Sequence, residues 1–223
     1  MPIPIDRLVR SRRKTIALIV QRDGTLTVRA PLRMAERRIH AFVEGHAKWI
    51  KEKKIQAKAS AVPAPRGYQP GETFPYLGVA YPLAIIPGQR QALALVDGRF
   101  QLASSALPEA EQAFTRWYRR KAKEVLSQRA AQLASVHGLE YQKVRISSAR
   151  TRWGSCSPKG VLSFTWRLVM APPEVIDYVI THELAHLKVR NHSKSYWEQV
   201  GWMMPAFKQW RVWLRKNGAS LNL

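Results

Sequence analysis

Cysteine and acidic residues are scarce in this sequence, and each shortage limits what the protein can be. Cys156 is the single cysteine of the 223 residues, so the chain has no intramolecular disulfide, which favours a reducing compartment. The sequence contains only 15 Asp and Glu but 37 Lys and Arg, which gives a formal net charge of +22 at pH 7. An excess of this size fits a soluble protein whose copies repel one another, or a polyanionic partner, either a nucleic acid bound through a basic surface or a phosphorylated substrate.

Long apolar runs are also missing. The longest run near the N-terminus, Ile16 to Val20, is far too short to span a bilayer. The first residues, MPIPIDRLVRSRRK, contain neither the apolar stretch nor the cleavage site of a signal peptide. We therefore expect a cytoplasmic protein without membrane contact.

What is present is typical of a globular protein, with 46% hydrophobic and 23% charged residues. The basic residues recur along the chain, in Arg7 to Lys14, Lys48 to Lys58 and Arg116 to Lys123. Such a distribution favours a basic face over a basic tail.

Residues 1–105 are predicted to form a β-rich N-terminal domain with one helix. A hairpin is expected where residues 15–21 and 26–29 flank Asp23-Gly24, followed by a helix at 35–58 and a connector with three prolines at 59–70. The remaining strands are expected at 73–77, 80–86, 92–96 and 99–102.

Residues 106–223 are predicted to form a second domain, in which helices enclose a small sheet. The helices are expected at 109–136, at 174–188 after Pro172-Pro173, and at 193–216, and the strands at 141–147, 149–157 and 161–168. Tryptophans 202, 210 and 213 have near-helical spacing and predict a core stripe on the last helix, with stacking on nucleobases as the alternative. This element order predicts an α+β fold.

The second domain contains an HExxH motif at residues 181–186, THELAH. Residues four apart share a face of an α-helix, so the imidazoles of His182 and His186 point at one ion. Glu183 then lies beside a water that the ion activates, and acts as general base when that water attacks. The motif predicts one Zn²⁺ per chain, although other divalent ions compete for such ligands.

A catalytic zinc takes three protein ligands, so a third is needed. His192 lies six residues after His186, and a left-handed conformation at Asn191 would turn the chain back toward the ion. The metzincin class has the same separation but uses Gly where this chain has Val189, so the local turn must differ. Glu198 is the alternative third ligand.

A second cluster, RTRWGSCS at residues 150–157, precedes the motif. Glycine in a strand lets another backbone approach closely, and an edge strand here would pair with an extended peptide. The arginines would instead, or in addition, bind phosphate or carboxylate, with core packing and solvation as the plainer interpretation. The lone Cys156 is interpreted as a buried small residue rather than a nucleophile or ligand. The candidate substrate-binding residues are Arg150, Arg152, Trp153, Gly154, Ser155 and Arg167.

Several segments resemble the YgjP-like metal-dependent hydrolases, which are grouped near the SprT and WLM metallopeptidases. The resemblance rests on WGSC, VLSFTWRLVMAPPEVIDYVITHELAHL and NHSKSYW, and on the N-terminal DG turn, VRAP and a helix ending in AKWI. It implies a zincin-like C-terminal domain, with zinc bound by His182, His186 and His192 and with Glu183 as general base. Thr165 stands where many relatives carry Asn, which implies a different specificity if that side chain touches substrate.

Three functions fit these features. The first is a zinc metallopeptidase, favoured by the HExxH motif and the strand-like RTRWGSC segment. The second is a metal-dependent nucleoside triphosphate pyrophosphatase, or another phosphoanhydride hydrolase, whose arginines bind a triphosphate; the P-loop sequence GxxxxGK[ST] is absent. The third is a nucleic-acid-binding protein with a structural zinc, which explains the charge but not Glu183 between two ligands. The expected substrate is thus a peptide or a nucleotide.

Overall fold

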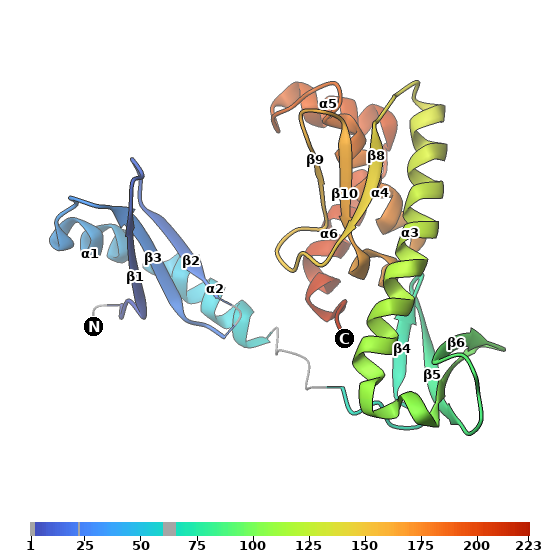
Figure 1. Cartoon of the computed structure of the whole chain (residues 1–223). Coiled ribbons are helices and arrows are strands. Elements are labelled where there is room, and N and C mark those ends of the chain that lie inside the picture. Colours follow the sequence, from blue (N-terminus) through green and yellow to red (C-terminus); the bar gives the residue numbers. More distant parts are fainter. Residues whose placement is uncertain (1–2, 22, 60–65) are drawn as a thin grey trace. The chain divides into compact units, whose positions relative to one another are not determined.

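The chain divides into two compact units, Met1–Ala64 and Pro65–Leu223. The computed structural model in Figure 1 describes residues 3–21, 23–59 and 66–223. The domain boundary expected between residues 105 and 106 therefore differs from the observed division. The physical reason is a shared aromatic core, because the Phe74 and Phe100 rings pack 4.1 and 5.2 Å from the ring of Phe114.

The first unit is a three-stranded sheet with two helices. Strand β3 (Leu26–Pro31) lies between β1 (Arg7–Ser11), to which it is parallel, and β2 (Ala17–Val20), to which it is antiparallel. The expected hairpin is confirmed, whereas β1 was not expected. The single helix expected at 35–58 is two helices, α1 (Glu36–Gly45) and α2 (Ala47–Ala59).

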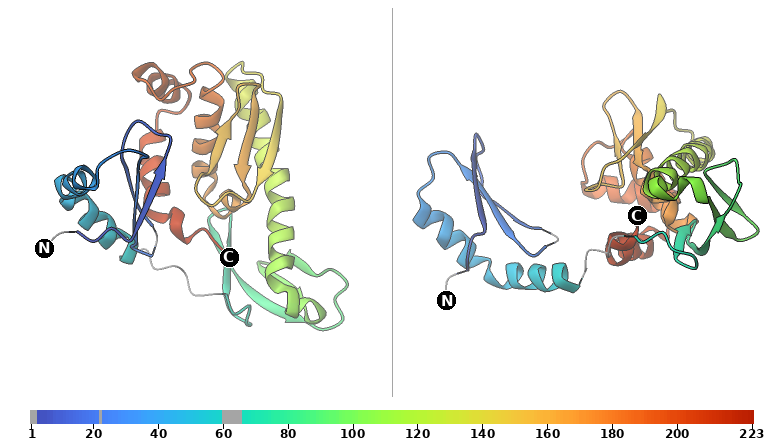
Figure 2. Two further views of the ribbon diagram at one scale, coloured as in Figure 1. Left: turned by 60° about the vertical axis from the view of Figure 1, so that its left-hand side comes forward. Right: turned by 60° about the horizontal axis from the view of Figure 1, so that its bottom comes forward.

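The core of this unit forms between the sheet and the helices. Alternate residues of β3 are buried together with three apolar residues of the helices, and Figure 2 shows both helices running along the sheet. These residues are Leu26, Val28, Ala30, Ile39, Val43 and Ile50. Residues 60–65 of the expected connector lie outside the described residues.

The second unit begins with a four-stranded sheet in the order β4-β5-β7-β6. The expected strands are confirmed to within about one residue as β4 (Thr73–Tyr76), β5 (Val79–Ile86), β6 (Leu93–Val96) and β7 (Arg99–Ala103). A 3₁₀ turn at Ser104–Glu109 then leads into the 27-residue helix α3 (Ala110–Val136). As Figure 1 shows, α3 runs along this sheet and on to the next one, joining them into one core.

The second sheet has the order β8-β10-β9 and carries one side of the candidate site. Strand β10 (Val161–Thr165) is parallel to β8 (Lys143–Ser147) and antiparallel to β9 (Gly154–Cys156), so β9 forms an edge. The strand expected at 149–157 is thus shorter than predicted, since exposed residues at its start form a loop. The strand expected at 161–168 ends at Thr165, where a 3₁₀ turn at Trp166–Met170 begins.

Three helices complete the unit: α4 (Pro173–Ala185), α5 (Lys194–Met203) and α6 (Phe207–Asn217), followed by a 3₁₀ turn at Gly218–Ser220. The single helix expected at 193–216 is wrong because Pro205 lacks the N–H that a helix interior needs. The tryptophan stripe fails with it, since Trp202 on α5 is 64% exposed.

The described residues form six α-helices and three small sheets, which confirms the α+β fold class. No helix within them combines the length and the apolar character needed to cross a membrane.

Candidate metal centre

Helix α4 presents the HExxH motif because most of its surface is packed into the core. It begins after Pro172, with Pro173 at its first position, where the missing N–H costs no hydrogen bond. Val175, Val179 and Ile180 are among its nine buried residues and anchor it in the unit. The helix ends at Ala185, not at residue 188 as expected, and His186 occupies the C-cap position.

Three imidazoles converge at the end of this helix. The Nε2 atoms of His182 and His192 are 3.2 Å apart, and one ring nitrogen from each of His182, His186 and His192 lies within 4.8 Å of the other two. Two nitrogens bound to one tetrahedral zinc at about 2.0–2.1 Å lie about 3.3 Å apart. The donor set therefore fits a single metal ion.

The segment after α4 brings His192 to the other two histidines by a route that differs from the expected one. Asn191 is not among the residues with a left-handed conformation; its side chain instead accepts a hydrogen bond from the Ser193 N–H at 3.3 Å. Ser193 caps α5, because its hydroxyl accepts from the Tyr196 N–H at 3.4 Å. His192 is thus held immediately before a capped helix.

Hydrogen bonds and ring packing orient the imidazoles. The Nδ1–H of His186 donates to the Val189 carbonyl at 3.1 Å, which leaves its Nε2 for an ion. The fully buried Tyr196 stacks on His186 at 4.6 Å and donates from its hydroxyl to the His182 carbonyl at 2.8 Å. Burial lowers the pKa of His182 to about 3, and burial also lowers the pKa of His186, so both rings are kept in the neutral form that binds metals.

Glu183 is buried between α4 and the edge strand β9, with 5% of its surface exposed. Burial raises the pKa of its carboxyl to about 8, opposed by the charge of Arg152 and by a hydrogen bond from the Cys156 N–H. A Cβ atom at Gly154 would lie 2.6 Å from the Glu183 Oε1 atom, so the strand approaches the carboxyl through a residue without a side chain.

An open cleft of about 460 Å³ exposes these groups. Its walls come from the end of α4, from the segment between α4 and α5, from β9, and from the turn after β9. Its lining residues are Gly154, Ser155, Cys156, Pro158, His182, Glu183, His186, Arg190 and His192. The Cys156 thiol is half-buried and its pKa is raised by burial, so it is a poor nucleophile at neutral pH.

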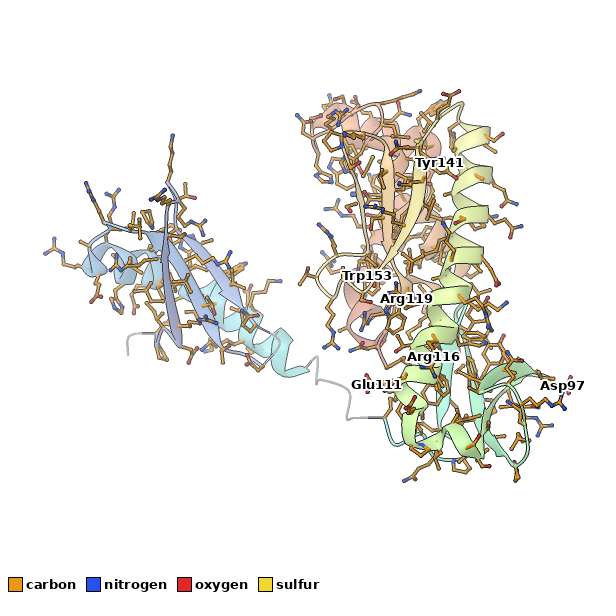
Figure 3. The ribbon with its side chains drawn as sticks, in the orientation of Figure 1. Asp97, Glu111, Arg116, Arg119, Tyr141 and Trp153 are labelled. Carbon is orange, nitrogen blue, oxygen red and sulfur yellow. The ribbon has the colours of Figure 1, made fainter. Side chains whose placement is uncertain are left out.

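The candidate substrate-binding residues separate into two groups. Gly154 and Ser155 line the cleft, and Arg152, Trp153 and Gly154 line an adjoining cavity of about 210 Å³ that also includes His182 and Glu183. Trp153, labelled in Figure 3, lies in the loop before β9.

The second group lies outside both cavities. Arg150 is exposed and lines neither of them. Arg167 is only 8% exposed, donates to Asn222 Oδ1 at 2.8 Å and lies over the Trp166 ring. Thr165 is 2% exposed and also lines neither cavity. Glu198 points to Lys194 on α5, at 3.8 Å, and is not part of the histidine cluster.

The structure adds residues that the sequence analysis did not select. Tyr178 lies one helical turn before His182 and lines the smaller cavity, and Trp197 packs its ring 5.9 Å from His182 and 5.8 Å from His192. The four-residue spacing of Tyr178 and His182 is visible in the sequence. Ser193 is a visible N-cap signal three residues before Tyr196, whereas the approach of Trp197 to the histidines depends on tertiary packing.

Comparisons with known proteins found a family and a solved structure that this chain resembles. The model of the YgjP-like family, described as a YgjP-like metallopeptidase domain, matches residues 14–217. Among solved structures, the metallopeptidase zymogen of Pyrococcus abyssi abylysin is similar, at 23% identity and a TM-score of 0.37, over 41% of this chain and 93% of that chain. No curated protein matches the chain. Since the family model spans most of the sequence, this protein belongs to the YgjP-like metallopeptidase-domain family.

Proposed function

We propose that this protein is a zinc-dependent metallopeptidase in which His182, His186 and His192 hold one zinc ion and Glu183 is the general base. The observation that carries the proposal is the convergence of three imidazoles beside a buried carboxyl, in a cleft bordered by an edge strand. Membership in a metallopeptidase-domain family supports the same activity. In this proposal, the second unit is a zincin-type catalytic domain.

The donor set favours a catalytic over a structural ion. Three histidines leave one position of a tetrahedral zinc open, whereas a structural zinc is closed by four protein ligands and usually by cysteines. Within the described part of the chain, the group of side chains that could hold an ion consists of these three histidines. Neutral imidazoles suit zinc, although other divalent transition metals also bind such sites.

A bound zinc ion would act as a Lewis acid that lowers the pKa of a coordinated water to about 7. Glu183 would take the proton of the attacking water and later pass it to the leaving amine. A neighbouring divalent cation would also lower the pKa of Glu183 and so favour the ionised base. The hydrogen bond from the Cys156 N–H would hold the carboxyl toward the cleft.

The substrate-binding part of the proposal rests on β9. This strand pairs only with β10 in its sheet and borders the cleft through Gly154, Ser155 and Cys156. An extended peptide can therefore add to the free edge by main-chain hydrogen bonds. Such pairing would bring a peptide bond to the imidazoles without requiring a particular side chain.

The nucleotide alternative loses part of its support. It depends on arginines that hold a triphosphate, yet Arg167 is engaged with Asn222 and Ser148, and Arg150 lines neither cavity at the histidines. Arg152 and Arg190 remain at the cavities, so nucleoside triphosphates are included as substrates in the tests below.

The first test is the metal content of protein purified without a His tag or added metal, measured by inductively coupled plasma mass spectrometry. We expect about one zinc per chain, and loss of it in His182→Ala and His192→Ala, because each substitution removes one of three ligands. Unchanged zinc in His182→Ala would overturn the site. If the zinc content is unchanged in His192→Ala alone, the third ligand is another residue. Glu198 would then be the first residue to substitute.

The second test separates the base from the ligands. Glu183→Gln keeps the size of the side chain but removes the base, so we expect full zinc content and a roughly 10²- to 10⁴-fold lower rate of casein cleavage. A parallel assay follows phosphate release from nucleoside triphosphates. Cleavage of nucleotides but not of casein by the wild-type protein would replace the peptidase proposal by the nucleotide alternative.

A further inference from the structure

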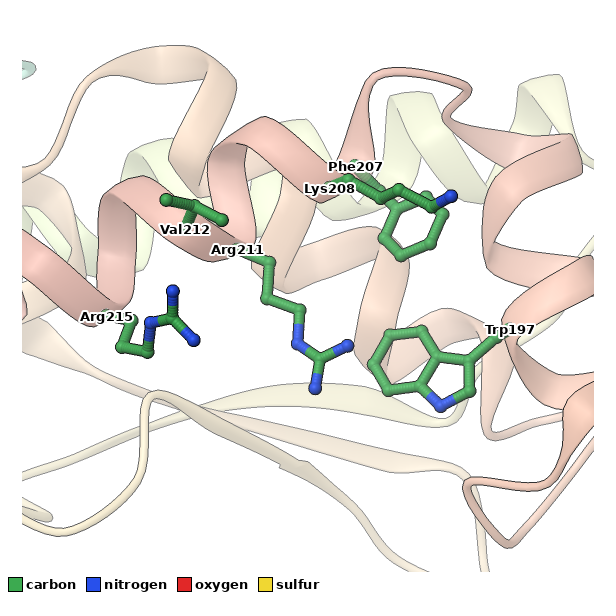
Figure 4. Close-up of a pocket in the computed structure, with 6 residues that line it drawn as sticks. All are labelled: Trp197, Phe207, Lys208, Arg211, Val212 and Arg215. Carbon is green, nitrogen blue, oxygen red and sulfur yellow. The ribbon is translucent and has the colours of Figure 1, made fainter.

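A third cavity, which is strongly basic, lies next to the candidate metal centre. It has a volume of about 510 Å³ and is lined by aromatic and aliphatic side chains together with three cationic ones (Figure 4). All but one of these residues belong to α6, and the exception is Trp197 of α5. The lining residues are Trp197, Phe207, Lys208, Arg211, Val212 and Arg215.

The cations of this cavity are without acidic partners in the part of the chain that the structure describes. Among the described residues, no ion pair involves Lys208, Arg211 or Arg215. Helix α6 contains four basic residues and no acidic one, so like charges face each other at helical spacing, which is unfavourable. Arg215 near the C-terminus of the helix is stabilised by the helix dipole, but Lys208 and Arg211 are not. An anionic ligand would offset this repulsion.

Trp197 connects the cavity to the histidines. Its indole ring lies beside the candidate metal centre, at 5.9 Å from the His182 ring and 5.8 Å from the His192 ring. The guanidinium of Arg211 lies over the same indole ring at 4.4 Å, and the Phe207 ring stacks on it at 5.6 Å. The cavity is thus separated from the imidazoles by the thickness of one side chain.

We propose that Lys208, Arg211 and Arg215 form a subsite that binds an acidic side chain of the peptide substrate, close to the bond that is cleaved. This inference rests on the proposed peptidase function and adds the substrate class. The planar guanidinium of Arg211 suits a carboxylate, which it binds through two parallel hydrogen bonds. Arg211 and Phe207 already pack against the Trp197 ring, so this ring is not free to stack on a nucleobase. The cavity is therefore better suited to bind an anion through its cations.

The separation between the basic cavity and the imidazoles also fits a peptide. Residues of an extended chain advance about 3.3 Å each. A residue one or two positions from the cleaved bond can therefore place its side chain on the far side of the Trp197 ring. A methylene stem of Glu would lie against Trp197, Phe207 and Val212, with its carboxylate among the cations.

The test compares peptides that differ by one charge. Cleavage sites in casein, located by mass spectrometry, define a peptide with Asp or Glu within two residues of the bond, and a second peptide carries Gln at that position. For the wild-type protein we expect kcat/KM to be about tenfold higher for the Glu peptide, the effect of one charge-assisted hydrogen bond. The ratio should fall toward one in Arg211→Glu and in Arg215→Glu.

The matched control is Lys216→Glu, which makes the same charge change on α6 at a residue that does not line the cavity. It should keep the tenfold ratio. If Lys216→Glu lowers the ratio as much as Arg211→Glu, the preference arises from overall charge and the subsite is overturned. An equal rate on both peptides by the wild-type protein overturns the subsite but leaves the peptidase function standing.

Binding to Glu183→Gln tests the subsite without turnover. Isothermal titration calorimetry should show about tenfold tighter binding of the Glu peptide than of the Gln peptide, and the difference should shrink at high salt. If casein is not cleaved, the same preference for an arbitrary peptide with one Glu over its Gln counterpart would keep the anion-binding subsite and reject the peptidase function. Displacement of the Glu peptide by inorganic pyrophosphate at lower concentration than by glutarate would assign the cations to phosphate and overturn the acidic side chain as the ligand.

Discussion

Gly154 lies so close to Glu183 that position 154 has no room for a side chain. An added Cβ would meet three atoms of Glu183, with Oε1 at 2.6 Å and Cγ at 2.7 Å. A flexible carboxyl could move away on an open surface, but Glu183 is 5% exposed and is enclosed by α4 and β9. The glycine therefore sets the distance between Glu183, the proposed base, and the strand on which a peptide would pair.

Gly154→Ala should therefore reduce activity without removing the ion. We expect kcat/KM to fall roughly 10²-fold, because a displacement of the base by about 1 Å has an effect of that size. Zinc content should stay near one per chain, since no histidine changes, and overpacking should cost about 1–3 kcal/mol of unfolding free energy. Casein cleavage, metal analysis and thermal unfolding measure the three quantities.

A matched glycine provides the control for this substitution. A Cβ at Gly45, the last residue of α1, meets no atom within 4 Å and needs no unusual backbone conformation. Gly45→Ala should leave activity, zinc content and stability at wild-type values or slightly raise stability. Full activity of Gly154→Ala would show that Glu183 has another position from which it works, or that it is not the base.

At the level of elements, the position of α5 against α4 decides whether the third imidazole reaches the other two. Tyr196 provides the link, because its hydroxyl on α5 donates to the carbonyl of His182 on α4 at 2.8 Å. Its ring also packs on His186. His192 precedes the first residue of α5, so any shift of this helix moves a predicted ligand.

Tyr196→Phe removes the hydroxyl and keeps the ring. We expect the affinity for zinc, measured by competition with a chelator, to fall by about tenfold, as is usual when a group that supports metal ligands is lost. The unpartnered carbonyl should also cost about 1–3 kcal/mol of stability. Tyr118→Phe is the control, since this buried hydroxyl donates to the Pro75 carbonyl at 2.6 Å. It should lose similar stability with no change in zinc affinity; equal loss of affinity in both variants would contradict the link.

Local signals in the sequence predict elements well where one turn or one helix face decides the outcome. The Asp97-Gly98 turn does take the left-handed conformations that its hairpin requires, with φ of 47° and 70°. Pro205 is a local signal too, yet the single helix predicted over residues 193–216 runs through it, whereas the structure ends one helix at Met203 and begins the next at Phe207. The parallel pairing of β1 with β3 has no local signature, because it depends on a contact between residues 20 apart.

In the candidate site, too, the features set by local spacing were predictable from the sequence and those set by contacts between distant elements were not. The helical spacing of His182 and His186 is a local property, and the structure brings His192 to them as predicted, although by a different turn. The metal ligands themselves stay a prediction. Arg211 was not predicted because it reaches His182 from another helix through Trp197, and no pattern of neighbouring residues encodes that approach. Arg167 shows the reverse case, in which a suggestive arginine supports the fold instead.

At the level of the whole molecule, the positive charge is unevenly divided between the two units. Residues 1–64 contain 15 Lys and Arg against 5 Asp and Glu, a net charge of +10, whereas the remaining 159 residues carry the other +12 of the total of +22. The first unit thus has the higher charge density, and it contains none of the residues of the candidate metal centre. A separate unit with this density is suited to hold a polyanion while the second unit performs the proposed cleavage of a peptide.

We therefore predict that the full chain binds duplex DNA or RNA without sequence preference, mainly through the first unit. Arg37→Glu/Arg38→Glu on α1 should weaken binding of a labelled duplex by more than tenfold and reduce the slope of log K against log salt by about two, because two phosphate contacts are lost. Arg116→Glu/Arg120→Glu on α3 makes the same charge change in the second unit, where Arg116 is labelled in Figure 3. This control should weaken binding less than threefold if position matters and not only net charge. Equal effects of the two variants would show that the total charge is what binds, and no binding at low salt would leave the charge without a nucleic-acid partner.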